Sequence, residues 1–157
     1  MILRARPLGA DLFAPYGEVL EQRPGDPARK NFAADLFSDR PEARPNLRIQ
    51  RTVPTTLPLT ATVIERHRQS SQMFAPMSGC AYLVVVFPSG EAGQPLLDQG
   101  EAFIAGPGQA VNYAADTWHH PFVALGEGGV FLMLRWEDGT EGDEEFFPLP
   151  EPIRIEL

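Results

Sequence analysis

The sequence predicts an all-β fold, a single-domain β-barrel or double-sheet jelly roll with few short helices. The chain of 157 residues contains 16 prolines and 14 glycines at short intervals, so no segment sustains a long helical period. Between these breaks lie about nine short segments with strand-like patterning. A chain of this length builds one hydrophobic core, and we therefore expect residues 1–157 to form one domain.

The expected elements are mostly strands. Short helices are predicted over Ala10–Ala14 and Phe32–Phe37. Residues 22–46 are the most loop-like stretch, which we interpret as a flap or as an arm onto a partner subunit. Strands are predicted over Glu18–Glu21, Leu47–Val53, Leu59–His67, Cys80–Phe87, Glu101–Ala105, Gln109–Tyr113, Pro121–Leu125, Val130–Glu137 and Ile153–Glu156.

The segment Leu59–His67 is the most informative of these strands. Because side chains alternate between the two faces of a strand, the apolar row that begins at Leu59 is expected to share a face with Glu65 and His67. An apolar row that ends in an acid and an imidazole is typical of a strand that runs from a core to the mouth of a pocket. A core histidine paired with a neighbouring carboxylate is the alternative.

The charge and composition exclude several classes of protein. The formal net charge is −8 and Lys30 is the only lysine, so nucleic-acid binding is not expected. Cys80 is the only cysteine, which favours a reducing compartment. The first residues lack the apolar region of a signal peptide, and the longest apolar run, Cys80–Phe87, is too short to span a bilayer. These features predict a cytoplasmic protein without membrane partners.

All three histidines fall in two short polar motifs. His67 lies in ERHRQSSQ, between Glu65 and Gln72, and His119 and His120 lie in DTWHHP. Histidine transfers protons near neutral pH and binds borderline metal ions. The two motifs therefore predict a catalytic or metal-binding site.

The two motifs resemble those of the cupin superfamily. Its first motif reads His-x-His, three or four residues, then Glu, and its second contributes a histidine from Gly-x-x-His. In this chain Glu65 occupies the position of the first His and Gln72 that of the Glu. Asp116 occupies the position of the Gly that precedes the second-motif histidine, here His119. The resemblance implies a cupin-like barrel with metal-ligand positions at Glu65, His67, Gln72 and His119.

Longer strings are similar to the ureidoglycolate lyase family, a cupin family of allantoin breakdown also described as ureidoglycolate hydrolase. These strings are FAPYGEVLE, LPLTATVIERHRQSSQMFAPM, AYLVVVFP, AFIAGPGQAVNYAADTWHHPFVAL and GDEEFF. The similarity runs with interruptions over nearly the whole chain and is weakest across residues 22–46. Three positions depart from the family: Arg68 replaces a common proline, Asp116 a common glycine, and Gly142 a residue often Cys or Asn.

The resemblance implies a carbon–nitrogen lyase that converts (S)-ureidoglycolate to glyoxylate and urea in purine catabolism. This cleavage needs a base near the hydroxyl, an acid near the ureido nitrogen, and a positive group for the carboxylate. His67 or Glu65 is the candidate base, and His119 or His120 is the candidate acid. The candidates for substrate binding are Gln72, Tyr82, Arg48 and Arg51, with Arg135 a further candidate for the carboxylate.

The resemblance also implies a divalent cofactor, with nickel as the metal of the family. Glu65, His67, Gln72 and His119 would form a set of two nitrogen and two oxygen donors, which suits Ni, Zn, Mn or Fe without selecting one. Such an ion would lower the pKa of the substrate hydroxyl. The alternative is a metal-free pocket in which these groups hydrogen-bond the substrate directly.

Other residues are expected to play structural roles. Tyr82 shares a face with Val84 and Val86, which would place its hydroxyl at the rim of the pocket. The acidic string EDGTEGDEEFF is expected to be a solvated loop, and Asn112 is expected to lie outside the site. Trp118 and Tyr113 are expected in the core. Since cupins resembling this chain pair through barrel edges, we also expect a homodimer.

Two other functions remain open at this point. The first is an amidohydrolase that releases ammonia and carbon dioxide from the same substrate, which would need a firmly held metal with an open position. The second is a non-catalytic cupin sensor of small ligands, which usually carries a DNA-binding domain or a basic face. The acidic chain shows neither.

Overall fold

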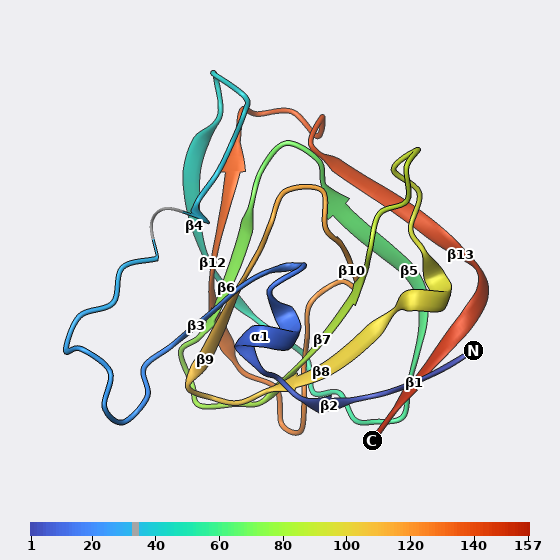
Figure 1. Ribbon diagram of the computed structural model, residues 1–157, viewed down its shortest axis with the longest axis horizontal. Coiled ribbons are helices and arrows are strands. Elements are labelled where there is room, and N and C mark those ends of the chain that lie inside the picture. Colours follow the sequence, from blue (N-terminus) through green and yellow to red (C-terminus); the bar gives the residue numbers. More distant parts are fainter. Residues whose placement is uncertain (33–34) are drawn as a thin grey trace.

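The computed structural model describes residues 1–32 and 35–157. In it, proline and glycine residues divide the chain into short strands. The strands form two sheets that face each other across a nearly closed barrel (Figure 1), which confirms the predicted all-β, cupin-like fold. The helices are short: α1 covers Ala10–Phe13, and the 3-10 helix η2 covers Leu97–Gln99. No described helix is long and apolar enough to cross a membrane.

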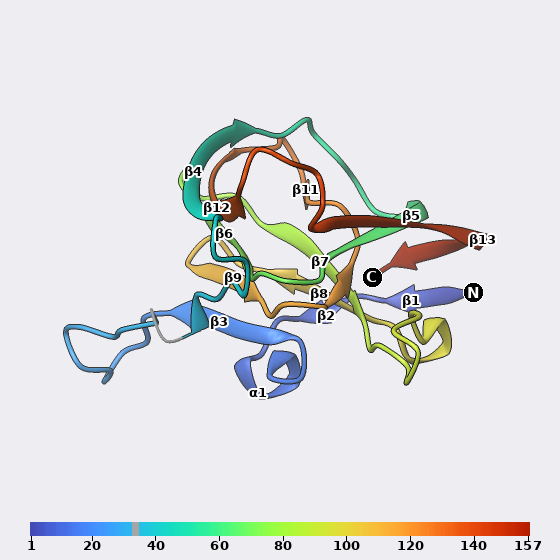
Figure 2. The ribbon, with the colours of Figure 1, turned by 90° about the horizontal axis from the view of Figure 1, so that it is seen from above.

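The larger sheet has eight strands and contains both chain termini. Its strands, in spatial order, are β1 (Ile2–Arg4), β13 (Glu144–Glu156), β5 (Leu59–His67), β10 (Trp118–His119), β7 (Tyr82–Phe87), β8 (Glu101–Ala105) and β2 (Arg6–Pro7), with β11 (Val123–Ala124) also paired to β7. The smaller sheet has five strands, in the order β3 (Gly17–Glu21), β9 (Gln109–Tyr113), β6 (Gln72–Pro76), β12 (Val130–Glu137) and β4 (Arg44–Arg51). Figure 2 shows α1 on the side of the molecule that carries β2 and β3.

Strand β7 is buried on both faces, which explains its unbroken apolar sequence YLVVVF. One face points between the two sheets, where Tyr82, Val84 and Val86 join a cluster that includes Phe103 of β8 and Phe131 of β12. The other face lies outside the barrel, where side chains of β5, β8, β10 and β13 cover it in a second cluster. Both clusters are almost inaccessible to water, so they supply most of the hydrophobic stabilisation.

Most predicted strands are confirmed, and four of them (β5, β8, β9 and β12) have the predicted bounds. The prediction missed β1, β2, β6 and β10, and it placed only the last four residues of β13 in a strand. The acidic string EDGTEGDEEFF is therefore not simply a solvated loop. Glu144–Phe147 pair with β5, and Asp143 is only 5% exposed.

The expected alternation along β5 holds only over part of the strand. Ala61 and Ile64 both pack in the second cluster, although strict alternation would place them on opposite faces. The pairing of β5 with β13 shifts between Pro148 and Ile153, and the alternation is reset there. The apolar row from Leu59 therefore does not share one face with Glu65 and His67.

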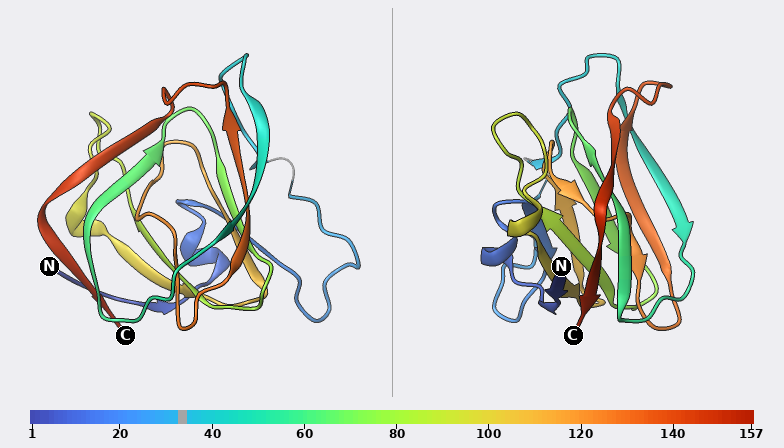
Figure 3. Two further views of the ribbon diagram at one scale, coloured as in Figure 1. Left: turned by 180° about the vertical axis from the view of Figure 1, so that it is seen from behind. Right: turned by 90° about the vertical axis from the view of Figure 1, so that its right-hand side faces the viewer.

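Within the segment 22–46, residues 22–32 project away from the sheets, and residues 35–43, its returning part, lie back against them before β4 begins (Figures 1 and 3). The returning part is held by the backbone bond from the Ser71 N–H to the Phe37 carbonyl, at 2.9 Å. The predicted helix Phe32–Phe37 includes residues 33 and 34, which lie outside the described residues. Ala10–Phe13 confirms the other predicted helix.

Candidate functional site

Three strands bring the two histidine motifs together inside the barrel. β10 pairs with β5 so that His119 lies directly opposite Glu65. Ligand atoms of Glu65, His67 and His119 all lie within 4.8 Å of one another. Gln72, at the start of β6, completes the cluster, because its Oε1 is 3.1 Å from His119 Nε2. The structure thus brings together the four predicted metal-ligand positions.

The His119 ring is held in one orientation. Its Nδ1 donates to the Thr117 carbonyl at 2.8 Å, and its ring stacks on Tyr113 with centroids 4.2 Å apart. Its Nε2 then faces two oxygen atoms, Gln72 Oε1 at 3.1 Å and Glu65 Oε1 at 3.5 Å. A lone pair facing two acceptor oxygens is unfavourable unless a proton or a cation lies between them. This arrangement is therefore built for a positive charge.

His67 presents a second free nitrogen to the same space. It is 5% exposed, and its Nε2 is buried without a hydrogen-bond partner among the described residues. Its Nδ1 lies 3.9 Å from Asp143 Oδ2. Burial, followed by the charge of His119, lowers the pKa of His67 to about 4. His67 is therefore neutral at pH 7 and can act as a ligand or accept a hydrogen bond.

Glu65 supplies the negative charge of the cluster. Burial would raise the pKa of its carboxyl group, but the hydrogen bond and charge of His119, with smaller effects of His67 and His120, outweigh burial and lower the pKa. The carboxylate is therefore ionised at neutral pH. Its Oε1 is the atom that approaches His119 Nε2.

These residues fit a divalent metal ion. The buried Nε2 of His67 lacks a partner, and His119 Nε2 faces oxygens of Glu65 and Gln72. The other ring nitrogens face outer acceptors, a carbonyl for His119 and a carboxylate for His67, as is usual for metal-binding histidines. Two imidazoles with oxygen donors suit a borderline transition metal.

Asp143 is a site residue that the sequence analysis missed. Its carboxylate accepts bonds from the Gln69 N–H at 2.6 Å and from the Ser70 hydroxyl, and it pairs with Arg40 at 3.5 Å. This carboxylate also faces His67 Nδ1. Asp143 lies in the string GDEEFF, but runs of acidic residues are usually solvated loops, so the sequence alone does not single it out.

Two departures from the family are accommodated by the backbone. Asp116 has φ 69°, in the left-handed region that favours glycine but that Asp tolerates. Its carboxylate bonds the buried Arg66 at 2.8 Å, and its N–H donates to the His67 carbonyl at 2.7 Å. The N–H of Arg68 donates to the Asp143 carbonyl at 3.2 Å, a bond that a proline could not make.

His120 lies beside the cluster. Its Nδ1 donates to the Pro121 carbonyl at 2.7 Å, and among the described residues it makes no hydrogen bond to the four clustered side chains. Burial lowers the pKa of His120, although the Pro121 bond and the charge of Glu65 oppose this. The ring is therefore neutral near pH 7, with its proton on Nδ1 and a lone pair on Nε2.

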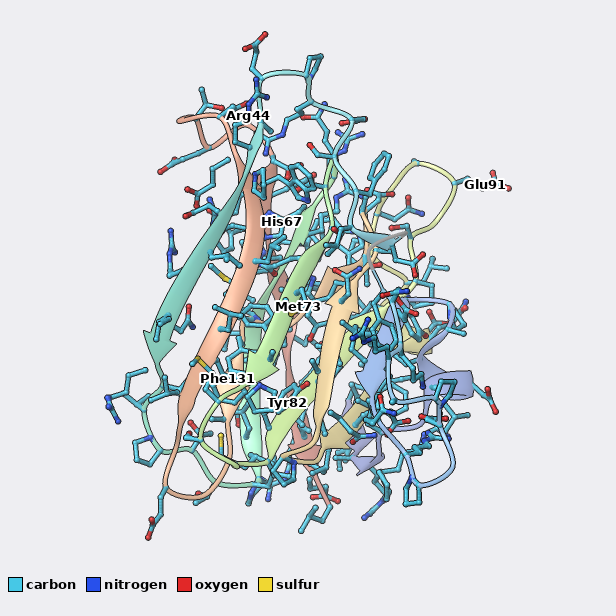
Figure 4. The ribbon with its side chains drawn as sticks, turned by 90° about the vertical axis from the view of Figure 1, so that its left-hand side faces the viewer. Arg44, His67, Met73, Tyr82, Glu91 and Phe131 are labelled. Carbon is cyan, nitrogen blue, oxygen red and sulfur yellow. The ribbon has the colours of Figure 1, made fainter. Side chains whose placement is uncertain are left out.

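The structure does not bring Tyr82 or Arg51 to the cluster. The Tyr82 hydroxyl donates to the Gln109 carbonyl at 2.9 Å inside the core, not at a pocket rim. Figure 4 shows Tyr82 and His67 well separated along the barrel. Arg51 is exposed and pairs with Val130, which places it with Leu47 and Ile49 on the outer face of β4.

Two other arginines lie on the inner face of the smaller sheet. Arg48 is paired with Met133 and is about half exposed, with a bond to Glu137 at 3.2 Å. Arg135 is closer to the cluster, because its charge contributes to lowering the pKa of His67. It is largely buried, between Glu137 at 2.7 Å and Glu144 at 3.7 Å. Arg135 is therefore the best-placed candidate for a substrate carboxylate.

The fold and the cluster define a cupin-like β-barrel protein with a buried histidine and carboxylate site. A sequence model described as ureidoglycolate lyase matches residues 1–156. The ureidoglycolate lyase of Chelativorans sp. (strain BNC1) is 40% identical, with 98% of this chain and 95% of that protein covered. The ureidoglycolate lyase of Azotobacter vinelandii is 36% identical, with 98% and 97% covered. This chain belongs to the ureidoglycolate lyase family.

A solved structure is also similar in outline. It is a dTDP sugar isomerase from Desulfovibrio desulfuricans G20, with a TM-score of 0.47 and 16% identity over 83% of this chain and 74% of that chain. A similarity of this size carries no conclusion about function.

We expect Asp143→Ala to destabilise the protein by roughly 1–3 kcal/mol, because it leaves the Gln69 N–H and the Ser70 hydroxyl without their acceptor, while Arg40 keeps Asp138 as a partner. The free energy of unfolding, from denaturant titration, measures this. Glu141→Ala, at an exposed position nearby, is the control and is expected to have little effect. Equal stability of the two variants would contradict a structural role for the Asp143 network.

Proposed function

We propose that this chain is a ureidoglycolate lyase that cleaves the carbon–nitrogen bond of (S)-ureidoglycolate to give glyoxylate and urea. Membership of the family supports the reaction. The observation that supports the site is the convergence of Glu65, His67 and His119, whose ligand atoms lie within 4.8 Å of one another.

Glu65, His67, Gln72 and His119 would hold a divalent metal ion. When bound, such an ion supplies positive charge that stabilises a deprotonated substrate oxygen. Tyr113, stacked on His119, and the Thr117 carbonyl keep the His119 ring in its orientation. The carboxylate of Asp143 lies 3.9 Å from the Nδ1 of His67, on the side of the ring away from the other ligands.

His120 is then the histidine left for proton transfer. Its Nδ1 donates to the Pro121 carbonyl, which leaves the Nε2 lone pair to take the proton of the substrate hydroxyl. As the carbonyl of glyoxylate forms, the carbon–nitrogen bond breaks and its electron pair moves to the ureido nitrogen. His120 returns the proton to that nitrogen and urea leaves, so the step consumes no water. Without an ion, Glu65 and His119 would carry these two transfers.

The test is incubation of chelator-treated protein with racemic ureidoglycolate, alone and with Ni²⁺, Mn²⁺ or Zn²⁺, with urea and ammonia assayed separately. We expect urea without ammonia, and only after an ion is restored. Urea formed without added ions would assign proton transfer to the clustered residues themselves. Ammonia would instead indicate the amidohydrolase, and the absence of both products would refute the proposed substrate.

In the same assay, His67→Ala and His119→Ala are each expected to lower turnover by roughly 10²-fold or more. Arg51→Gln, on the outer face, is the control and is expected to keep wild-type activity. Circular dichroism checks that each variant is folded. Near-wild-type turnover by either folded histidine variant would show that the site is misplaced.

We propose that Arg135 binds the substrate carboxylate. Its guanidinium group lies near the cluster between two carboxylates, which a substrate carboxylate can replace as partner. Arg135→Gln is expected to raise KM roughly tenfold or more, which corresponds to the loss of a charge-assisted hydrogen bond. Steady-state kinetics of this variant are compared with those of Arg48→Gln, at the more exposed arginine. A KM unchanged in Arg135→Gln but raised in Arg48→Gln would transfer the role to Arg48.

We also propose that the protein is a cytoplasmic homodimer. The single free cysteine suits a reducing compartment. The edge strand β4 carries Leu47 and Ile49, which are 62% and 66% exposed, on its outer face. An exposed apolar edge strand favours pairing with another chain.

Light scattering is expected to give twice the mass of one chain. Ile49→Asp, which places a charge on the apolar edge, is expected to shift the mass toward that of the monomer. A monomeric wild type would refute the dimer.

A further inference from the structure

A cavity of about 600 Å³ lies on the outer face of the smaller sheet, and the histidine cluster does not line it. One wall consists of Glu18 from β3 and Asn112 from β9, which are paired across the two strands. The opposite wall is the returning part of segment 22–46, which contributes Asp35 and Phe37. Asn112, which the sequence analysis placed outside the site, therefore lines a different cavity.

The three polar residues are held close together by the backbone. The Asn112 side-chain amide donates to the Asp35 carbonyl at 2.8 Å, which ties the segment to β9. Gly17, with φ 147°, lets β3 approach β9 closely, since an added Cβ would lie 2.0 Å from the Asn112 carbonyl oxygen. Glu18 and Asp35 both line the cavity, one from each wall.

Two oxygen atoms of this cluster are buried without a partner among the described residues. They are Glu18 Oε2 and the amide Oδ1 of Asn112, a side chain that is only 2% exposed. Buried acceptors are nearly always hydrogen-bonded, and an exception needs an explanation such as a bound water or ion. Here the two residues with unpartnered acceptors line the same cavity as a second acidic residue, Asp35.

We propose that Glu18, Asp35 and Asn112 form a binding site for a hard divalent cation such as Ca²⁺, which fastens the returning segment to the outer face of the smaller sheet. All three side chains offer oxygen donors, the ligands that Ca²⁺, Mg²⁺ and Mn²⁺ prefer. The histidine cluster, with two imidazoles, suits borderline transition metals instead. The two sites thus differ in the metals they select.

The same segment supports the histidine cluster. Beyond Asp35 it bonds Ser71 through the Phe37 carbonyl at 2.9 Å, and Arg40 then pairs with Asp143 at 3.5 Å. Asp143 in turn faces His67. A cation at Glu18 and Asp35 would therefore stabilise a segment that helps to position the candidate active site from the other face of the sheet.

The test is calorimetric titration of CaCl₂ into the purified full-length protein, with Tm measured at constant ionic strength. We expect one saturable site and a Tm that rises with Ca²⁺ concentration. Glu18→Gln and Asp35→Asn, which preserve shape, are expected to weaken binding roughly tenfold or more, because each removes a charged ligand. Glu127→Gln, at an exposed carboxylate elsewhere, is the matched control and should bind as the wild type does.

A further control separates this site from the lyase. His119→Ala should keep Ca²⁺ binding intact, whatever its effect on ureidoglycolate cleavage. The proposal is overturned if the folded wild type shows no saturable Ca²⁺ binding, or if both carboxyl variants bind as the wild type does. It is also overturned if His119→Ala abolishes binding, which would place the ion in the histidine cluster.

Discussion

Strand β10, only two residues long, is the element on which both the core and the candidate site depend. It pairs with β5 on one side and with β7 on the other, and so joins the two halves of the larger sheet. Trp118 points out of the barrel into the second cluster, under the Arg66 guanidinium, and its ring N–H donates to Gly93. His119 points inward, beside Glu65. A slip of one residue would exchange the two side chains, so the packing of Trp118 holds His119 in register.

The interior of the barrel changes from apolar to polar along its length. At the end marked by Tyr82 it is apolar, and even the tyrosine hydroxyl is satisfied by a backbone carbonyl. At the end marked by His67 (Figure 4), acceptor atoms and neutral imidazole face each other with few donors among them. Burial disfavours the protonated form of His67, whereas the carboxylate of Glu65, whose field is screened little inside the protein, favours a bound cation.

The sequence alone predicts the strands that have a strong apolar or alternating pattern, and it predicts the site side chains that carry the family motifs. β5, β8, β9 and β12 have apolar or alternating sequences between clear turn residues, and they were predicted with their bounds. β1 and β2 are short edge strands held by parallel pairing with distant partners, and their own sequences carry little signal. Asp143 escaped prediction because its importance comes from Arg40 and Ser70, far from it in sequence. The role of Asn112 likewise comes from the segment that returns over β9.

The parallel pairing of β1 with β13 joins the two ends of the chain, with Ile2 opposite Arg154 and Arg4 opposite Glu156 (Figure 3). During translation, β1 is made long before its partner β13. The larger sheet can therefore be completed only once β13 has been synthesised, and the apolar outer face of β5 and β7 lacks the side chains of β13 until then. A chaperone that shields apolar strands would accordingly act on the chain in the interval between the synthesis of β7 and that of β13.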